Sequence, residues 1–317
     1  MKKKLLALLL AAALCLALAA CGEKDDEAKY VVGICQLQAH DALDAATQGF
    51  IDALNEALPG QVKFETKVAG ETANCPTVIN GFVSKRVDLI LANATPALTA
   101  AASATDSIPI LGTSITAYGV ALDLDDFSGT VGGNISGTSD LADLAAQADM
   151  IGAWFPQAKK VGLLFCSGEP NSRYQVEEVA AYLAQKGMET KEFSFTDTND
   201  VTSVTQAAAE WADVIYIPTD NTAASNSEAI ANVVLSAGTP VIAGEEGICT
   251  GCGVATLSIS YYDLGVTTGK MAARILTGEA DISEMPIEFT TATAKYNADV
   301  CAQLGITPLA GYTAIGD

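Results

Sequence analysis

Short polar segments follow most of the apolar runs in this chain, and their residue types suit the binding of a small charged molecule. Asn93 and Thr95 follow one such run, and Thr219-Asp220-Asn221 follows another. Hydroxyl groups and the unpaired N–H groups at the start of a helix suit a carboxylate. Asp220, Glu245 or Asp140 suits an ammonium group. The sequence therefore predicts a binding site for a small molecule that carries both groups.

Other apolar runs end in the same way, which favours a shared site over isolated helix caps. The further polar segments are residues 36–40, 112–116, 167–172 and 244–246. The alternative is that single residues only cap helices, because Thr95 directly precedes Pro96, and Asp220 or Asn221 suits the same role. His40, the only histidine, lies at the expected start of a helix, where it is either a solvated residue or a ligand contact.

The elements that must position these segments occur twice along the chain. Predicted strands lie at residues 30–35, 62–68, 89–92 and 108–111, and again at 160–166, 189–195, 214–217 and 239–243. Strands that alternate with helices predict parallel sheets with right-handed crossovers. We therefore predict an α/β fold of two similar Rossmann-like lobes. Because ligands bind beyond the carboxyl ends of such strands, two facing sheet edges would enclose a cleft.

The sequence gives little support to catalysis or to a metal site. His40 has no serine or cysteine partner in a recognisable nucleophile motif. Cys249 and Cys252 form a CxxC pair, but a single histidine and the absence of a second CxxC pair argue against zinc. A local disulfide between them stays open. We predict no catalytic residue, no metal ligand and no cofactor.

The first residues indicate export and not folded structure. Lys2, Lys3 and Lys4 precede an apolar run over residues 5–20, and small residues precede Cys21. We predict a signal peptide over 1–20, lipid on Cys21 and a polar tether over 21–29 that holds the folded part at a bilayer outside the cytoplasm. An ordinary signal peptide is the alternative. The net charge of −21 argues against nucleic acid as a partner.

Six segments, taken together and in order, resemble a known family. They are VGICQLQAHDALDAATQGFIDAL, VDLILANATPA, NISGTSD, VIYIPTDNTAAS, PVIAGEEG and YYDLGVTTGKMAARIL. They are similar to the ABC-transporter substrate-binding lipoproteins of the tryptophan/tyrosine-binding type. The resemblance implies the type I periplasmic-binding fold, in which three crossover hinge strands join two lobes around a ligand. It also implies an aromatic or other hydrophobic amino acid as ligand, and an ABC permease with its ATPase subunits as partners. We expect a monomer.

The resemblance carries over to candidate ligand-binding positions of this sequence. They are Gln36, His40, Asn93, Thr95, Thr116, Tyr118, Asp140, Asn171, Ser172, Thr219, Asp220, Asn221, Glu245 and Ser260. Thr95 and the amides near Pro96 are then expected to bind the carboxylate, and Asp220, with Glu245 or Asp140, the amine. The chain departs from the family pattern where Ala117-Tyr118 replaces an Asp-Pro pair and Ser260 replaces an aspartate. Ala39-His40-Asp41 also stands where Glu-His-Pro is usual. Tyr118 is expected to compensate by stacking on the ligand.

The chain is expected to cross between the lobes near Asn134, Ser258 and Met285. Lobe one then comprises residues 30–134 and 258–285, and lobe two comprises 135–257 and 286–317. Two other functions stay open at this point. One is a secreted α/β enzyme that acts on a small metabolite, with Asp220 or Glu245 as base. The other is a sensor lobe for a membrane signalling partner.

Overall fold

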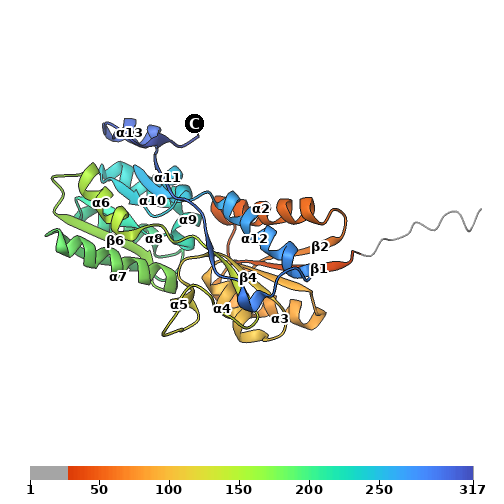
Figure 1. The fold of residues 1–317 in the computed structure, drawn as a ribbon. Helices are drawn as coiled ribbons and strands as arrows, with labels where there is room; N and C mark the ends of the chain where they lie inside the picture. The colour runs from red at the N-terminus through yellow and green to blue at the C-terminus, as the bar shows by residue number, and fades with distance from the viewer. Residues whose placement is uncertain (1–27, 317) are drawn as a thin grey trace, which may run out of the picture.

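The computed structural model describes residues 28–316, which form two β-sheets, each covered by helices (Figure 1). The predicted signal peptide, Cys21 and most of the predicted tether lie outside the described residues. Between residues 28 and 316, no helix combines the length and the apolar character that a membrane span requires.

The first sheet has six strands in the order β11-β5-β4-β3-β1-β2, and all neighbouring strands in it are parallel. Its strands are β1 (Tyr30–Gln36), β2 (Val62–Val68), β3 (Leu89–Asn93), β4 (Ile110–Ile115), β5 (Ile135–Ser139) and β11 (Glu288–Phe289). Its helices are α2 (Asp41–Ala57), α3 (Cys75–Lys85), α4 (Thr95–Ala104), α5 (Tyr118–Ala121) and α12 (Tyr261–Leu276), with the 3-10 turns η1 (Thr72–Asn74) and η2 (Ile282–Glu284). We call this half lobe one.

The second sheet has seven strands in the order β13-β12-β10-β9-β8-β6-β7, and only the β10–β12 pair is antiparallel. Its strands are β6 (Lys160–Cys166), β7 (Glu189–Phe195), β8 (Val214–Ile217), β9 (Val241–Ala243), β10 (Ala255–Ser258), β12 (Thr293–Tyr296) and β13 (Thr313–Ala314). Its helices are α6 (Leu144–Trp154), α7 (Pro170–Gln185), α8 (Val201–Trp211), α9 (Asn221–Ser225), α10 (Ser227–Ala237), α11 (Glu246–Cys252) and α13 (Ala298–Leu304). We call this half lobe two.

The two lobes repeat the same topology, which confirms the predicted pair of Rossmann-like lobes. The order β2-β1-β3-β4-β5 in lobe one corresponds to β7-β6-β8-β9-β10 in lobe two. A local detail recurs as well. Asp88, just before β3, accepts a hydrogen bond from the Val31 N–H at 2.7 Å. Asp213, just before β8, accepts from the N–H groups of Lys159 and Lys160 at 2.8 and 2.9 Å.

The chain crosses between the lobes three times, and two crossings lie later than expected. The boundaries expected near residues 134 and 285 assign β5 and β11 to lobe two, but β5 pairs with β4, and β11 pairs with β5. Both strands therefore complete the sheet of lobe one. The crossings follow them, at residues 140–143 and 290–292, and the remaining crossing is at 259–260. Strand pairing at a sheet edge is a tertiary contact, and the local sequence pattern does not report it.

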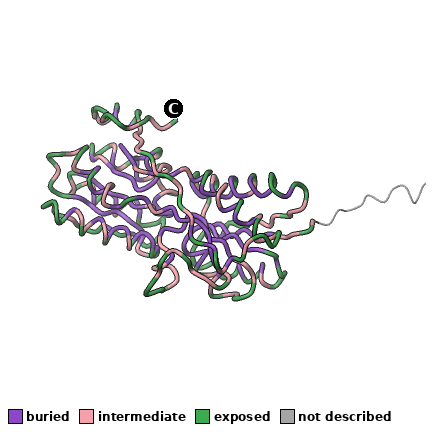
Figure 2. Tube along the Cα trace, in the orientation of Figure 1, coloured by how far each residue is buried: buried purple, intermediate pink, exposed green. Residues whose placement is uncertain are grey.

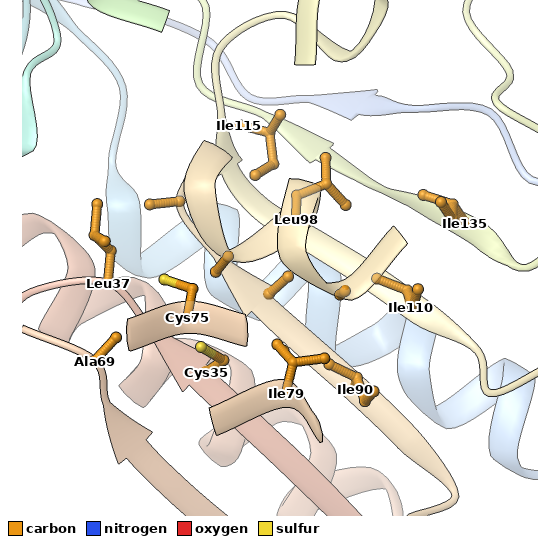
Figure 3. Close-up of a cluster of buried hydrophobic side chains, with 14 of the residues drawn as sticks. Cys35, Leu37, Ala69, Cys75, Ile79, Ile90, Leu98, Ile110, Ile115 and Ile135 are labelled. Carbon is orange, nitrogen blue, oxygen red and sulfur yellow. The ribbon is translucent and has the colours of Figure 1, made fainter. Parts of the chain in front are cut away.

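Helices on both faces bury the central strands completely. All residues of β3 and of β8 are buried, and the buried trace runs through the middle of each lobe (Figure 2). In lobe one, Ile79 of α3 and Leu98 of α4 join Ile90 and Ile110 of the sheet in one apolar cluster (Figure 3). Because the strands are fixed in this way, the polar segments that follow them are held at defined positions along the sheet edge.

Helix α12, which follows the second crossing, packs against α2 at two glycines. A Cβ atom on Gly49 would lie 2.2 Å from the Tyr262 carbonyl oxygen, and one on Gly265 would lie 2.0 Å from the Ala46 carbonyl oxygen. Only a residue without a Cβ allows the two helices to approach this closely. The contact fixes the start of α12 against α2, whose first turn lies beside the candidate site.

This close approach predicts a large effect for a small substitution. Gly49→Ala should lower the free energy of unfolding by about 1–3 kcal/mol because the added methyl group forces the helices apart. Gly81→Ala is the matched control, since no atom lies within 4 Å of a Cβ built at this helical glycine. The control should be neutral or stabilise the protein by up to about 1 kcal/mol. Thermal unfolding of both variants checks this, and equal melting temperatures would contradict the packing argument.

Candidate functional site

The carboxyl ends of strands from both lobes meet at one pocket, which we call the central pocket. It is lined by His40, Ala42, Leu43, Ser114, Thr116, Asp140, Asn171, Thr219, Asp220, Asn221, Ala224, Glu245 and Tyr261. The expected positions that the structure brings together here are therefore His40, Thr116, Asp140, Asn171, Thr219, Asp220, Asn221 and Glu245. The cavity between these residues is about 10 Å³, which is roughly the space that one water molecule needs.

Four buried polar atoms that line the central pocket have no hydrogen-bond partner. They are His40 Nδ1, Ser114 Oγ, Asp140 Oδ1 and Asn171 Oδ1. Ser114 is 6% exposed, and Asp140 and Asn171 are each 4% exposed, so water in the surrounding solvent does not satisfy them. Buried polar atoms in folded proteins are almost always paired. A group of unpaired atoms from both lobes around one cavity is typical of a site that awaits a polar ligand.

The existing hydrogen bonds define which of these atoms are acceptors. Asn171 Nδ2 donates to the Thr219 carbonyl oxygen at 3.0 Å, which leaves its Oδ1 as an acceptor. Asn221 Nδ2 donates to Glu169 at 2.6 Å, so its Oδ1 accepts from His40 Nε2 at 3.3 Å. Burial lowers the pKa of His40, which favours the neutral ring with its proton on Nε2. His40 Nδ1, Asp140 Oδ1 and Asn171 Oδ1 are therefore three unpaired acceptors, and Ser114 provides a free hydroxyl.

Asp140 is the carboxylate in the pocket with a free oxygen atom. Its Oδ2 accepts a hydrogen bond from the Tyr261 hydroxyl at 3.0 Å, whereas Oδ1 has no partner. Burial raises the pKa of Asp140 to about 6. Tyr261 is the first residue of α12, directly after the second crossing, and it orients the carboxylate that lies in the first crossing.

Asp220 and Glu245 have no free oxygen, because each caps a helix. The Asp220 carboxylate accepts from the N–H groups of Ala223 at 2.7 Å and Cys166 at 2.6 Å. Glu245 accepts from the N–H groups of Gly247 and Ile248. The alternative interpretation as a cap is confirmed for Asp220, and Glu245 has the same role at the start of α11. Burial raises the pKa of Asp220 to about 8, with a further contribution from the charge of Glu169, and burial raises that of Glu245 to about 7.

Glu169 is a central residue that the sequence analysis did not single out. It is 2% exposed and binds the backbone N–H and the side chain of both Asn221 and Thr222, at 2.6–3.0 Å. This carboxylate therefore ties the segment after β6 to the segment after β8 and orients Asn221 toward His40. The sequence signal for such a role is an acidic residue directly before Pro170, where α7 begins.

The other expected site residues lie outside the central pocket. Gln36 bonds Thr47 and Asp44, and Asn93 bonds Thr47 and the Leu43 carbonyl oxygen, so both support the start of α2. Ser260 caps α12 through the Asp263 N–H. The Ser172 hydroxyl donates to the Thr219 carbonyl oxygen at 3.5 Å.

Tyr118 and Thr95 differ most from expectation. Tyr118 is 1% exposed and donates to the Thr138 carbonyl oxygen at 3.1 Å, in contact with Gly112 and Gly137. It is a core residue of lobe one and does not line the central pocket. Thr95 is the first residue of α4 and is not its N-cap, which is Ala94. Thr95 is 3% exposed and borders a separate groove.

The cysteines and the possible metal ligands among residues 28–316 bear on the chemistry of the site. All six described cysteines are free thiols, so Cys249 and Cys252 are two unbonded buried residues of α11. The described residues contain no group of histidine, cysteine or acidic side chains arranged to bind a metal ion.

Comparison with known proteins identifies the family. Residues 31–308 match the sequence family of ABC transporter substrate binding proteins. The chain belongs to this family. Over 270 residues it is 31% identical to a tyrosine-binding protein of Clostridioides difficile strain R20291. The match covers 83% of this chain and 77% of that protein.

Two solved structures of similar proteins differ in their ligands. One is an ABC domain from Streptococcus pneumoniae in complex with L-Trp, at 31% identity and a TM-score of 0.85 over 90% of this chain and all of the other. The second is the ligand-free, open structure of a substrate-binding protein with adhesive properties from Clostridium difficile. It is also 31% identical, with a TM-score of 0.68 over 90% of this chain and 99% of the other. This chain therefore has the two-lobe fold of type I periplasmic binding proteins.

The buried charge of Asp140 predicts a stability that depends on pH. Because the pKa of Asp140 is raised in the folded state, the native protein holds a proton that the unfolded chain releases between pH about 4 and 6. The stability that the folded protein gains by holding this proton on Asp140 is therefore complete below pH about 4 and is lost as the pH rises through about 6. Asp140→Asn should raise the free energy of unfolding by roughly 1–3 kcal/mol at pH about 7.5, and this gain should vanish near pH 4.

Denaturant unfolding at the two pH values measures this gain. Asp149→Asn is the control, since the side chain of Asp149 is 66% exposed in α6. A loss of stability in Asp140→Asn that is equal at both pH values would contradict the assignment.

Proposed function

We propose that this substrate-binding protein is an extracytoplasmic, lipid-anchored receptor of an ABC importer. In this proposal it captures an amino acid with an aromatic or hydrophobic side chain in the cleft between its lobes and presents it to the permease and ATPase subunits. The observation that carries the proposal is the set of unpaired buried atoms from both lobes around the central pocket.

The chemistry of the unpaired atoms favours an ammonium group as the anchor. An ammonium group has three N–H donors and no acceptor, and the pocket offers three unpaired acceptors in His40 Nδ1, Asp140 Oδ1 and Asn171 Oδ1. The cavity of about 10 Å³ is comparable with the size of such a group. The Ser114 hydroxyl is then a donor for the ligand's carboxylate. Asp140 takes the role that the sequence assigned first to Asp220, since both oxygens of Asp220 already accept backbone hydrogen bonds.

The backbone at Ser114 supports a functional role for its hydroxyl. Ser114 has a φ of 56°, and the register between β4 and β5 shifts between Gly112 and Ile115. A residue other than glycine is disfavoured in this left-handed region by about 1–2 kcal/mol. Strain of this kind persists where the surrounding structure holds it, often at binding sites.

The arrangement of the lobes supports ligand capture by closure. His40 of lobe one bonds Asn221 of lobe two, and the Ser225 hydroxyl of lobe two donates to Gln38 of lobe one. At equal sequence identity, the TM-score is 0.85 to the L-Trp complex and 0.68 to the open, ligand-free relative. An amino acid needs more space than the cavity provides, so the lobes must separate to admit it and close again around it.

The remaining elements of the proposal rest on the sequence. The lysines at 2–4, the apolar run at 5–20 and Cys21 support export and acylation. The negative net charge of −21 supports a role without nucleic acid. We propose a monomer without a cofactor, since the binding of an amino acid needs neither a second subunit nor a prosthetic group.

The lipid anchor makes a separate prediction. Cys21→Ala should move the protein from the membrane fraction to the soluble fraction of cells that express the full chain, because the acyl chains provide its attachment. Cys35→Ala, in the buried strand β1, is the control and should stay with the membrane. Mass spectrometry of the wild-type N-terminus checks the modification directly. Retention of Cys21→Ala at the membrane would contradict acylation at this residue.

Calorimetric titration with the twenty common L-amino acids tests the ligand. We expect at least one aromatic or hydrophobic amino acid to bind with a Kd below about 100 μM, equivalent to roughly −5.5 kcal/mol. Asp140→Asn should weaken it by about 10–100-fold through the loss of a charged hydrogen bond, and Asp149→Asn should bind normally. The analogue of the ligand without its amino group should not bind. If no amino acid binds in this range, the ligand class is wrong; if Asp140→Asn binds normally, the anchor is wrong.

A further inference from the structure

Two of the free cysteines lie against each other in the core of lobe one. Cys35 belongs to β1 and Cys75 is the first residue of α3, and both are fully buried. They are members of the same apolar cluster, in which their sulfur atoms lie close together (Figure 3). The two thiols also share a side-chain hydrogen bond. The fold therefore brings together two sulfur atoms from segments that are far apart in the sequence.

Packing on either side of the pair holds the two segments in this arrangement. A Cβ atom on Gly33 of β1 would lie 2.6 Å from the ring of Phe82 of α3, so the helix packs directly on the strand. The Ala69 N–H donates to the Gln36 carbonyl oxygen at 2.8 Å, and Asn74 Nδ2 donates to the Ala69 carbonyl oxygen at 2.9 Å. The cysteines therefore meet the first requirement for a disulfide, which is that their side chains face each other across a short distance.

The surroundings of Cys75 favour the thiolate that disulfide chemistry requires. The free N–H groups and the dipole at a helix N-terminus stabilise a thiolate there. The Cys75 S–H is directed at the Glu71 carbonyl oxygen at 4.0 Å, so its sulfur can accept from Cys35. This hydrogen bond lowers the pKa of Cys75, and the same interaction, together with burial, raises the pKa of Cys35. Cys75 is therefore the better nucleophile of the two.

Other thiols of the described residues face backbone groups instead. Cys166, Cys252 and Cys301 point at the carbonyl oxygens of Thr196, Ile248 and Val254, at 3.7, 3.4 and 3.9 Å. Among residues 28–316, Cys35 and Cys75 are the pair that shares a thiol–thiol hydrogen bond. The contact between these two sulfur atoms is therefore specific to this place in the fold.

We propose that Cys35 and Cys75 form a disulfide bond when the chain meets an oxidising disulfide outside the cytoplasm. The location follows from the proposed export, but the bond itself does not depend on it. The Cys75 thiolate attacks one sulfur of the oxidant and expels the other as a thiolate. The Cys35 thiol then loses its proton, attacks Cys75 Sγ and expels the second thiolate. Two S–H bonds of the protein and one S–S bond of the oxidant are thus replaced by one S–S bond of the protein and two S–H bonds of the reduced oxidant.

The bond would form as the chain folds, because both sulfur atoms are buried once α3 packs on β1. It would enclose residues 36–74, which contain α2 and β2. A cross-link that closes a long loop stabilises the folded state mainly by restricting the unfolded chain. Glu71, Thr72 and Ala73, just before Cys75, line a hollow of about 600 Å³ that Gly168 of lobe two also lines. The disulfide would therefore fix the lobe-one wall of this hollow between the lobes.

Refolding in a glutathione buffer tests the disulfide on purified full-length chain, whether or not the protein is exported or binds an amino acid. The protein is unfolded in denaturant and refolded with oxidised glutathione or with dithiothreitol. Free thiols are then alkylated under denaturing conditions, and the digested protein is examined by mass spectrometry. We expect a peptide that joins Cys35 to Cys75 in the oxidised sample alone, and alkylated Cys166, Cys249, Cys252 and Cys301 in both samples. Alkylated Cys35 and Cys75 in the oxidised sample, or a different pairing, overturns the proposal.

Thermal unfolding measures the constraint separately. The oxidised protein should melt at least about 5 °C above the reduced protein. Cys75→Ala should lose this difference because it removes the attacking sulfur. Cys252→Ala is the matched control at a buried cysteine of lobe two, and it should keep the difference. An oxidised wild-type protein that melts at or below the reduced one overturns the proposal, as does a difference that persists in Cys75→Ala.

Discussion

Unpaired acceptors held in a buried pocket are the feature on which the proposed binding of a ligand depends. A buried hydrogen-bonding atom without a partner destabilises a fold by about 1–3 kcal/mol. Here His40, Asp140 and Asn171 each present such an atom to the central pocket. A protein can tolerate this loss of folding stability where a ligand supplies the missing hydrogen-bond donors. Because folding has already ordered these acceptors and removed them from water, the ligand binds without that cost.

The neighbouring carboxylates show the contrast between binding and structural roles. Asp220 and Glu245 satisfy their oxygens with backbone N–H groups at helix starts, and Glu169 binds the segment that carries Asn221. They hold the tips of lobe two in place. Asp140 lies at the first crossing, where one of its oxygens is fixed by Tyr261 from the second crossing and the other is free. The proposed ligand anchor therefore belongs to the hinge, where a motion of the lobes would change its surroundings.

The sequence predicted the fold well because the fold depends on local patterns. Buried strands, helical spacing and polar strand ends repeat in both halves, and parallel strands with crossovers can be arranged in few ways. Asn171 and Thr219 follow β6 and β8 of lobe two, Asp140 follows β5 of lobe one, and all three line the central pocket. The lobe boundaries were less accurate, since β5 and β11 are defined by their pairing at a sheet edge.

The roles of individual site residues could not be predicted from the sequence for a physical reason. An aspartate after a strand has the same local pattern whether it caps a helix, as Asp220 does, or leaves an oxygen unpaired in a pocket, as Asp140 does. The difference depends on which backbone groups the fold brings within reach. Tyr118 and Thr95 illustrate the same limit. The glycines at 112 and 137 make room for the Tyr118 ring in the core, and Thr95 is buried at the first turn of α4 and does not line the central pocket.

A crystal structure of the protein with its amino acid ligand tests the central claim most directly. We predict closed lobes and an ammonium nitrogen within hydrogen-bond distance of Asp140 Oδ1, Asn171 Oδ1 and His40 Nδ1. A bound ligand that leaves these three atoms without partners, or that lies outside the space between the lobes, would contradict it.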